Sequence, residues 1–417
     1  MHAYPVETHQ LGNGLRVAVA PSDSPGVAVN LWYEVGSTDE APHRTGFAHL
    51  FEHLMFQGSA NVGSGEHMAL IESAGGQVNA TTSSDRTNYF ETVPPGALEL
   101  ALWLEADRLQ SLEITEANFE AQRAVVKEEK RERYDNRPYG DLLELVVGQH
   151  FPTSHPYGHL TIGSMEHLDA ARLDDVAEFF DTWYRPSNAR LVLAGAVTVD
   201  DGLALAERHF GSLPAKPAPP PRRVVDQPTL SPSALEISRD VPYDVGYLSW
   251  PTAHAADEQL PALELALSIL ADGHAARLHR EIVRGSGLAQ ETSALHLTHR
   301  RAPSLALLVA RPQDGIDPRR TLDAIHAALA RFLDEGPSEE EFSRALAQHE
   351  RAWLWDLATA ESRADMFNEA WLVHGDPGEL NAALAHVLTL TPDDVREAAA
   401  RWLAPAHSST LIYRQGA

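Results

Sequence analysis

The chain of 417 residues contains no cysteine. That absence excludes disulfide bonds, thiolate ligands for a metal and a cysteine nucleophile. The sequence also has no apolar run long enough to cross a membrane as a helix, so no transmembrane span is expected. No basic stretch followed by an apolar one begins the chain, so no secretory signal is expected. We therefore expect a cytoplasmic protein, or a periplasmic one if a signal peptide has been removed.

Basic residues are scarce, because 33 Lys and Arg stand against 59 Asp and Glu, for a formal net charge of −26. A negative surface repels phosphates, so we expect no nucleic-acid partner. The same field attracts basic peptides, although such a charge also serves simply to keep a protein in solution. The hydrophobic content of 43% is ordinary for a globular protein. The length suggests two or three domains.

The segment GFAHLFEHLMFQGS holds a motif of two histidines and an acid, His49-Leu-Phe-Glu52-His53. Apolar residues around it recur every three or four positions, which predicts a helix. Residues four apart share a helix face, so His49 and His53 can point at one spot, with Glu52 at its border. Two imidazoles, a third protein ligand and an open position make a catalytic zinc site, and a neighbouring carboxylate can take a proton from water. The alternative is a helix with two histidines that are satisfied by ordinary hydrogen bonds.

A third metal ligand is expected from residues 115–135, TEANFEAQRAVVKEEKRERYD. This segment is predicted to be a helix, because Thr115 is a good N-cap and the segment contains neither Gly nor Pro. Its apolar residues mark the expected inner side: Phe119, Val125 and Val126. Glu128 and Glu129 are the acids next to that side, and spacing alone does not choose between them.

The rest of the chain alternates predicted strands and helices. We predict strands within residues 11–21, 27–35, 77–93 (two strands), 189–197, 235–237, 245–250 and 409–413, and helices at residues 66–74, 98–109, 174–183 and 258–270, with further helices up to residue 401. Histidines at positions 150, 155 and 159 lie among prolines and a glycine, which indicates a loop more than a second metal site.

Seven prolines in residues 214–232 indicate an extended linker between two halves. We therefore predict an N-terminal domain at residues 1–213 and a C-terminal domain at residues 233–417. Each half begins with strands, continues through helices and ends with a strand. The pattern predicts an α+β protein with a mixed sheet covered by helices in each half.

Five segments occur in the order that is typical of one protein family: GFAHLFEHLMFQGS, GGQVNATTSSDRTNYF, FEAQRAVVKEE, HPYGHLTIGSMEHL and WYRPSNARLVLAGAV. In these segments the chain resembles the pitrilysin or insulinase family (M16) of zinc metallopeptidases. The resemblance is to its short two-domain subclass, which includes the mitochondrial processing peptidase subunits and bacterial two-subunit peptidases. It is dense over the first 200 residues and weaker in the second half.

The resemblance implies two homologous α/β sandwich domains with the pitrilysin/LuxS-like metallohydrolase fold, each with a mostly antiparallel sheet. It implies that Zn²⁺ is bound by His49, His53 and Glu129, that Glu52 is the general base, and that the activity is that of an endopeptidase. It also implies that the strand at Asn79-Ala80-Thr81 is an open edge to which a peptide substrate adds by backbone hydrogen bonds. The alternative for this strand is an ordinary hairpin.

Two departures from the family pattern bear on activity. Self-sufficient members carry an Arg and, seven positions later, a Tyr that hold the substrate backbone. When the GLA triplet at 287–289 is aligned with the family, these positions are Val283 and Gln290, and the neighbouring Arg284 would face another direction on a helix. Gln122 stands where many active members have a glutamate, and it is expected to contact a metal ligand from the second shell without taking a proton.

These losses predict a division of labour between two chains. This chain would be the metal-bearing subunit of a heterodimer, completed by a paralogous M16 subunit that carries the Arg and Tyr, with a homodimer as the alternative. The expected substrates are peptides or unfolded polypeptide segments. The competing interpretation is a weakly active or non-catalytic assembly subunit, for which a buried acid beside two histidines would have no use.

Overall fold

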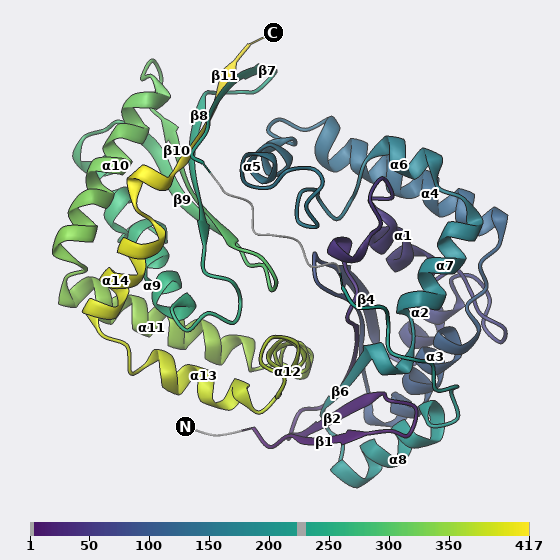
Figure 1. Ribbon diagram of the computed structural model, residues 1–417. Coiled ribbons are helices and arrows are strands. Elements are labelled where there is room, and N and C mark those ends of the chain that lie inside the picture. Colours follow the sequence, from purple (N-terminus) through teal and green to yellow (C-terminus); the bar gives the residue numbers. More distant parts are fainter. Residues whose placement is uncertain (1–3, 223–230, 417) are drawn as a thin grey trace. The chain divides into compact units, whose positions relative to one another are not determined.

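The computed structural model describes residues 4–222 and 231–416, which form two compact units (Figure 1). Of the described residues, unit 1 takes 4–132, 159–222 and 354–382, and unit 2 takes 133–158, 231–353 and 383–416. Each unit is a mixed sheet covered by helices, as predicted. Within the described residues, no helix is both long and apolar enough to cross a membrane.

The sheet of unit 1 has six strands in the order β1-β2-β6-β3-β5-β4. The strands are β1 (Glu7–Gln10), β2 (Arg16–Pro21), β3 (Val27–Tyr33), β4 (Gln77–Thr82), β5 (Thr87–Val93) and β6 (Ala189–Gly195). Only the β2–β6 pair is parallel. Every residue of β3 and β6 is buried, and their sequences are mostly apolar because both faces of the sheet are covered.

Helices cover the two faces of this sheet. They are α1 (Phe47–Leu54), α2 (Glu66–Ser73), α3 (Leu98–Ser111), α4 (Glu116–Lys130), α6 (Met165–Ala170), α7 (Leu173–Trp183), α8 (Val199–Phe210) and α12 (Ala360–His374). Alternate residues of β3 point to opposite faces. Trp32 bonds to α12, whereas the ring of Tyr33 packs on Tyr184, which follows α7. Helix α12 therefore covers the face opposite to that of α1 and α7.

Unit 2 has a five-stranded sheet in the order β7-β11-β8-β10-β9, in which only β7 and β11 are parallel. Its strands are β7 (Ala234–Arg239), β8 (Val245–Thr252), β9 (Ala289–Leu297), β10 (Ser304–Pro312) and β11 (Ser409–Gln415). Its helices are α5 (Leu142–His150), α9 (Leu260–Ala271), the π-helical η5 (His279–Gly285), α10 (Pro318–Glu335) and α14 (Pro392–Trp402). Trp250 and Phe332 are fully buried in its core. Three elements run across the limits between the units: the π-helical η3 (Arg131–Asp135), α11 (Glu339–Asp356) and α13 (Glu379–Val387).

Most predicted elements are confirmed, but the expectation of helices alone between residues 270 and 401 is wrong. Strands β9 and β10 form an antiparallel hairpin there. The sequence of β9, AQETSALHL, is largely polar because this strand lies at the sheet edge, and it therefore lacks an apolar strand pattern. Sequence reasoning also missed β1, whose four residues are all exposed, and the helices α5 and α8.

Each half of the sequence contributes one whole helix to the unit that is formed mainly by the other half. Helix α12 of the C-terminal half packs on β3 and β6 in unit 1, and α5 of the N-terminal half belongs to unit 2. In α5, Nε2 of His150 lies 2.8 Å from Oγ of Ser249, and Nε2 of Gln149 donates to the carbonyl of Thr410 at 3.0 Å. Contacts therefore divide the chain differently from the consecutive ranges 1–213, 214–232 and 233–417. Residues 223–230 of the expected linker lie outside the described residues.

Acid is expected to weaken the attachment of α5. Burial lowers the pKa of His150 to about 4, whereas the unfolded chain takes up this proton near pH 6.5. The unfolded state then binds more protons between these values, so the free energy of unfolding falls as the pH drops from 6.5 to 4. Urea titrations at pH 7 and pH 4.5 measure how much free energy of unfolding is lost on acidification. This loss should be about 2 kcal/mol smaller in His150→Gln than in wild type, because glutamine keeps a hydrogen-bonding group but does not titrate. Equal losses in both proteins would contradict this assignment.

Candidate metal centre

The short helix α1 lacks a capping side chain of its own, because Gly46, at φ +96°, is its N-cap. A carboxylate from outside the helix fills that role. Glu40 accepts from the backbone N–H of Gly46 at 3.0 Å and of Ala48 at 2.8 Å. Nε2 of His159 lies 3.0 Å from the same carboxylate and 3.1 Å from the carbonyl of Ser37. Burial raises the pKa of Glu40, and these contacts fix the position of the helix start.

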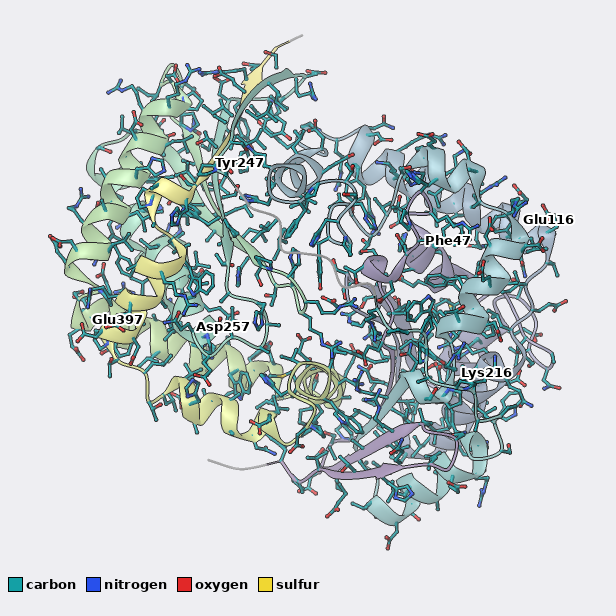
Figure 2. The ribbon with its side chains drawn as sticks, viewed as in Figure 1. Phe47, Glu116, Lys216, Tyr247, Asp257 and Glu397 are labelled. Atoms are coloured by element: carbon teal, nitrogen blue, oxygen red, sulfur yellow. The ribbon has the colours of Figure 1, made fainter. Side chains whose placement is uncertain are left out.

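The apolar face of α1 fixes the rotation of the helix. Phe47, labelled in Figure 2, begins the helix and is buried, as are Leu50 and Leu54. The ring of Phe51 stacks on that of Phe179 of α7, with centroids 5.1 Å apart. Because these side chains face inward, the opposite face, which carries both histidines, is left for α4.

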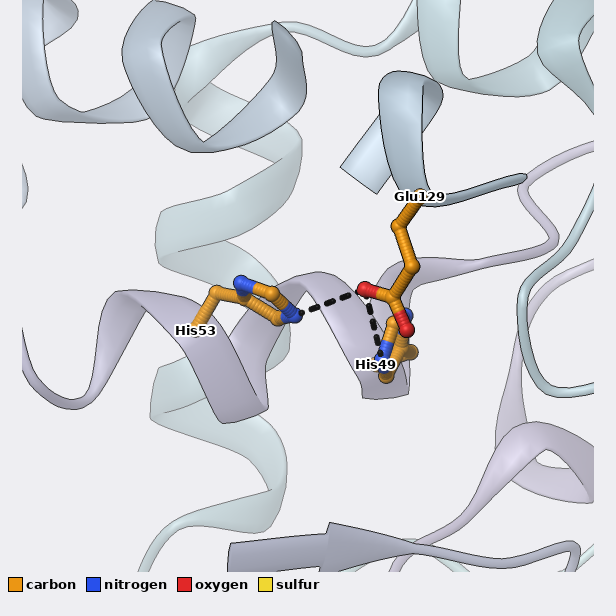
Figure 3. Close-up of side chains that lie close together, drawn as sticks. All are labelled: His49, His53 and Glu129. Carbon is orange, nitrogen blue, oxygen red and sulfur yellow. Dashed lines mark ion pairs between the residues drawn. The ribbon is translucent and has the colours of Figure 1, made fainter. Parts of the chain in front are cut away.

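Three side chains converge between α1 and α4 (Figure 3). The carboxylate oxygen Oε2 of Glu129 lies 3.4 Å from Nε2 of His53 and 3.7 Å from Nε2 of His49. The two imidazole rings lie 4.8 Å apart and are nearly perpendicular, at 81°. All three side chains are largely shielded from solvent, with exposed fractions of 12% to 22%.

These residues fit a zinc ion. Tetrahedral ligands at about 2.0–2.1 Å from zinc are about 3.3 Å from one another. The distances of 3.4 and 3.7 Å between the ligand atoms are close to that spacing before any adjustment. Two nitrogens and one oxygen are also the donor set of many catalytic zinc sites, in which a fourth position is kept for water.

The tertiary structure makes the choice between the two glutamates of α4. Glu129 points at the histidines, whereas Glu128 is exposed and accepts from Arg131 at 2.8 Å. The expected inner side of α4 was partly wrong: Phe119 and Val126 are buried, but Val125 is 47% exposed. Adjacent residues on a helix are about 100° apart, so Val125 and Val126 do not share a buried face.

Gln122 lies seven residues before Glu129 on α4, two helical turns away, and is half-buried. Among the described residues, no hydrogen bond joins its amide to His49, His53 or Glu129. Its role beside the ligands stays a prediction.

Glu52 lies beside the three ligands, held by a hydroxyl. Thr82 donates its Oγ1 hydrogen to Oε2 of Glu52 at 2.5 Å. Burial raises the pKa of Glu52, and the charge of Glu129 adds to this effect, while the Thr82 hydrogen bond and His53 oppose it. A half-buried carboxylate with a raised pKa, oriented next to a metal site, is the arrangement that a general base needs.

The strand that holds Thr82 is the edge of its sheet. Strand β4 is last in the order of unit 1, and Asn79 and Thr81 are exposed while Ala80 is buried. Ser83 N–H donates to the carbonyl of Arg86 at 2.8 Å, in register with the β4–β5 ladder. Hydrogen-bonded pairs alternate along an antiparallel ladder, so the backbone groups of Ala80 and Thr82 face the open edge. The N–H of Ala80 is 2.9 Å from the side-chain oxygen of Asn79. The edge position was predicted correctly.

A second group of acids and a histidine lies fully buried: His67, Glu91 and Glu105. Nε2 of His67 is 3.1 Å from Glu91, and Arg108 forms a two-pronged ion pair with Glu105. Burial, and then the neighbouring Glu105, raises the pKa of Glu91, while burial lowers the pKa of His67 to about 3. Arg108 places a positive charge within this cluster through its ion pair with Glu105.

Val283 and Gln290, the positions of the missing Arg and Tyr, lie in unit 2. Val283 belongs to η5 and packs against the core of that unit. Gln290 is in β9 and donates from Nε2 to Asp314 at 3.0 Å. Arg284 is the exposed neighbour of Val283. An aliphatic side chain and an amide in these places supply no cation and no phenol.

Zinc binding distinguishes the two glutamates. Glu129→Ala removes one of three protein ligands, so we expect zinc content after dialysis to fall from about one per chain to below about one tenth. Glu128→Ala on the same helix should retain zinc, since that side chain faces solvent. Metal analysis of both variants by mass spectrometry measures this difference. Equal zinc content in the two variants would contradict the assignment of Glu129.

Two sequence profiles match the chain. Residues 16–154 match the profile described as Insulinase (Peptidase family M16), and residues 170–349 match the one described as Peptidase M16 inactive domain. His49, His53 and Glu129 all lie within the first of these matches.

Proteins similar over nearly the whole chain are named as zinc proteases. Zinc protease PqqE of Helicobacter pylori is 26% identical over 413 residues, which are 98% of this chain and 92% of that protein. An uncharacterized zinc protease of Mycobacterium tuberculosis is 27% identical over 394 residues, 93% of this chain and 88% of that one. The beta subunit of the mitochondrial processing peptidase of Bos taurus is 32% identical over 204 residues, 48% of this chain and 41% of that subunit.

Solved structures agree with these matches. The crystal structure of a protease from Helicobacter pylori superposes with a TM-score of 0.92 at 26% identity, covering 99% of this chain and all of that one. A putative M16-like peptidase from Alicyclobacillus acidocaldarius has a TM-score of 0.86 at 20% identity, covering all of this chain and 99% of that one, and shows the same fold. The motifs, the fold and both profiles therefore lead to one conclusion: the chain belongs to peptidase family M16.

Proposed function

We propose that this chain is a zinc-dependent endopeptidase that acts on peptides or unfolded polypeptide segments. One observation carries the proposal: His49, His53 and Glu129 converge with zinc-ligand spacing while Glu52 is held beside them. Relatives named as zinc proteases support it. Zinc bound by the three ligands supplies a Lewis acid that polarises a carbonyl and makes a water more acidic.

Glu52 and Thr82 are the residues proposed to carry out and to orient the proton transfers. Glu52 accepts the proton of the attacking water as the new C–O bond forms, and then delivers it to the amine nitrogen as the C–N bond breaks. Thr82 keeps one oxygen of Glu52 occupied, so the other oxygen is the one left for proton transfer. The raised pKa of Glu52 moves it closer to neutral pH, where a base that must also act as an acid is most effective.

The open edge of β4 supports a peptide substrate. Backbone groups at Ala80 and Thr82 face away from β5, so an extended segment can pair with them without regard to its side chains. Thr82 also contacts Glu52, which places the docking strand next to the proposed base. Peptides and unfolded segments offer such an extended strand most readily, and they are the substrate class that we propose.

A partner subunit is the proposed source of the groups that Val283 and Gln290 lack. A missing donor for the charge that develops on the scissile carbonyl costs about 10²–10³ in rate. The similarity to the beta subunit of the mitochondrial processing peptidase, which is named as a subunit, supports a heterodimer with a paralogous M16 chain. A homodimer is the alternative. We place the enzyme in the cytoplasm, or in the periplasm if a signal peptide has been removed.

The second candidate function is an assembly subunit with little activity. It is favoured by Val283 and Gln290, and by the match of residues 170–349 to a profile described as an inactive domain. The converging ligands and the buried, hydrogen-bonded Glu52 oppose it, because assembly alone requires neither.

Hydrolysis of a mixed fluorogenic peptide library tests the proposal. The zinc-loaded chain is assayed alone and with the paralogous subunit, next to Glu52→Gln and the matched control Glu128→Gln. We expect cleavage only in the mixture, a loss of at least about 10³-fold in Glu52→Gln, and no change in Glu128→Gln, with zinc content equal in all three.

Each other outcome selects an alternative. Full activity of the chain alone would replace the heterodimer by a self-sufficient enzyme. Stoichiometric zinc without cleavage, both by the chain alone and by the chain with its partner, would favour the assembly subunit.

A further inference from the structure

A helix from the C-terminal half reaches the sheet of the proposed active site. Asp365 of α12 accepts three hydrogen bonds at a single oxygen, Oδ1. The donors are Nδ2 of Asn30 at 3.2 Å, Nε1 of Trp32 at 3.2 Å and Nδ2 of Asn88 at 3.1 Å. A carboxylate suits three converging donors, because it accepts several hydrogen bonds without offering one.

The bond to Asp365 decides which way the amide of Asn88 points. With its nitrogen toward α12, its oxygen turns toward β4 and accepts from Oγ1 of Thr81 at 2.6 Å and from Arg86 at 3.2 Å. Arg86 also donates to the carbonyl of Thr81 at 3.1 Å, and its guanidinium lies over the ring of Trp32 at 4.8 Å. These contacts connect the last residues of β4 and the first residues of β5 to α12.

Thr82 carries the effect of these α12 contacts to the opposite face of the sheet, where α1 lies. Successive side chains of a strand point to opposite faces, so Thr81 is held on the α12 side while Thr82 reaches the α1 side. There Oγ1 of Thr82 donates to Glu52 at 2.5 Å. An edge strand has a neighbour on one side only, so its end depends on such contacts more than a central strand does.

We infer that Asp365 is a positioning residue for the reaction, one that holds the Glu52 carboxylate through Asn88, Thr81 and Thr82. The inference rests on the proposed peptidase function and deepens it: a residue 313 positions after Glu52 in the sequence sets the geometry of the base. It also assigns a task to α12, the helix that the C-terminal half contributes to unit 1.

Helix α12 offers a matched control one turn away. Glu361 accepts from Oγ1 of Thr92 at 2.8 Å, so it also joins α12 to β5, but at the end of that strand remote from Thr82. Both Asp365→Leu and Glu361→Leu replace an acid that bonds to β5 by an apolar side chain of similar size. Asp365→Leu removes the acceptor of three hydrogen bonds and Glu361→Leu the acceptor of one, so stability should differ between the two and the positioning role is tested by kcat and by exchange near Thr82.

The experiment uses the zinc-loaded full-length chain, with its partner subunit if activity requires one. Asp365→Leu should lower kcat by about tenfold to a hundredfold, because a base displaced by a fraction of an ångström transfers protons poorly. Zinc content should equal that of Glu361→Leu, whose kcat should stay within about twofold of wild type. The thermal midpoint should fall further in Asp365→Leu, because three donors lose their acceptor there. In the Thr82→Val background, Asp365→Leu should have little further effect, because both act through one contact. Equal kcat in the two leucine variants, or additive effects in the double variant, would overturn the inference.

Hydrogen–deuterium exchange supplies a readout without turnover. In Asp365→Leu, amides of residues 77–93 should exchange faster by about tenfold, and in Glu361→Leu those near Thr82 should not. If wild type cleaves nothing, the proposed function fails, and exchange alone then decides whether Asp365 holds the strand. Unchanged exchange near Thr82 in Asp365→Leu would overturn the inference whatever the activity.

Discussion

The rotation of one eight-residue helix is the constraint on which the candidate site depends. Two imidazoles can share a metal only if α1 turns both of them toward Glu129. The packing of Phe51 and its apolar neighbours sets that rotation, and Glu40 holds the start of the helix where a glycine gives no cap of its own. A helix this short is not stable alone in water, so tertiary contacts must supply its stability. The geometry of the candidate metal site therefore depends on the surrounding core.

Polar contacts connect Glu52 to progressively more distant parts of unit 1. Thr82 contacts Glu52 directly, the β4–β5 hairpin carries Thr82, and α12 holds the hairpin from the opposite face of the sheet. The buried group of His67, Glu91 and Glu105 contains a cation of its own, Arg108, which distinguishes it from the triad of His49, His53 and Glu129. Burial lowers the pKa of His67 there, whereas the triad presents two imidazoles and a carboxylate with no arginine among them.

The two units depend on both halves of the sequence, because each half contributes a helix to the unit built mainly by the other. Helix α5 places His150 against Ser249, and α12 places Asp365 against Asn88. The N-terminal half does not bury its sheet on both faces by itself, since β3 and β6 are covered by α12. Helix α12, which follows the residues 170–349 that match the profile described as inactive, thus contributes structure to the unit that holds the candidate metal ligands.

The sequence by itself determined the parts that depend on local spacing. The i,i+4 histidines share a face in any helix, and apolar residues marked β3. Glu129 and the β4 edge came from the family resemblance and not from spacing. Three features were decided only by the tertiary structure: the capping of α1 by Glu40, the exposure of Val125 and the placement of α5 and α12 in the unit of the opposite half. The polar edge strand β9 also lacked a readable pattern. For α5, α12 and β9 the physical reason is that each depends on a partner surface far along the chain, of which local spacing carries no record. Glu40 is near α1 in the sequence, but its role as a cap depends on how the loop before the helix folds.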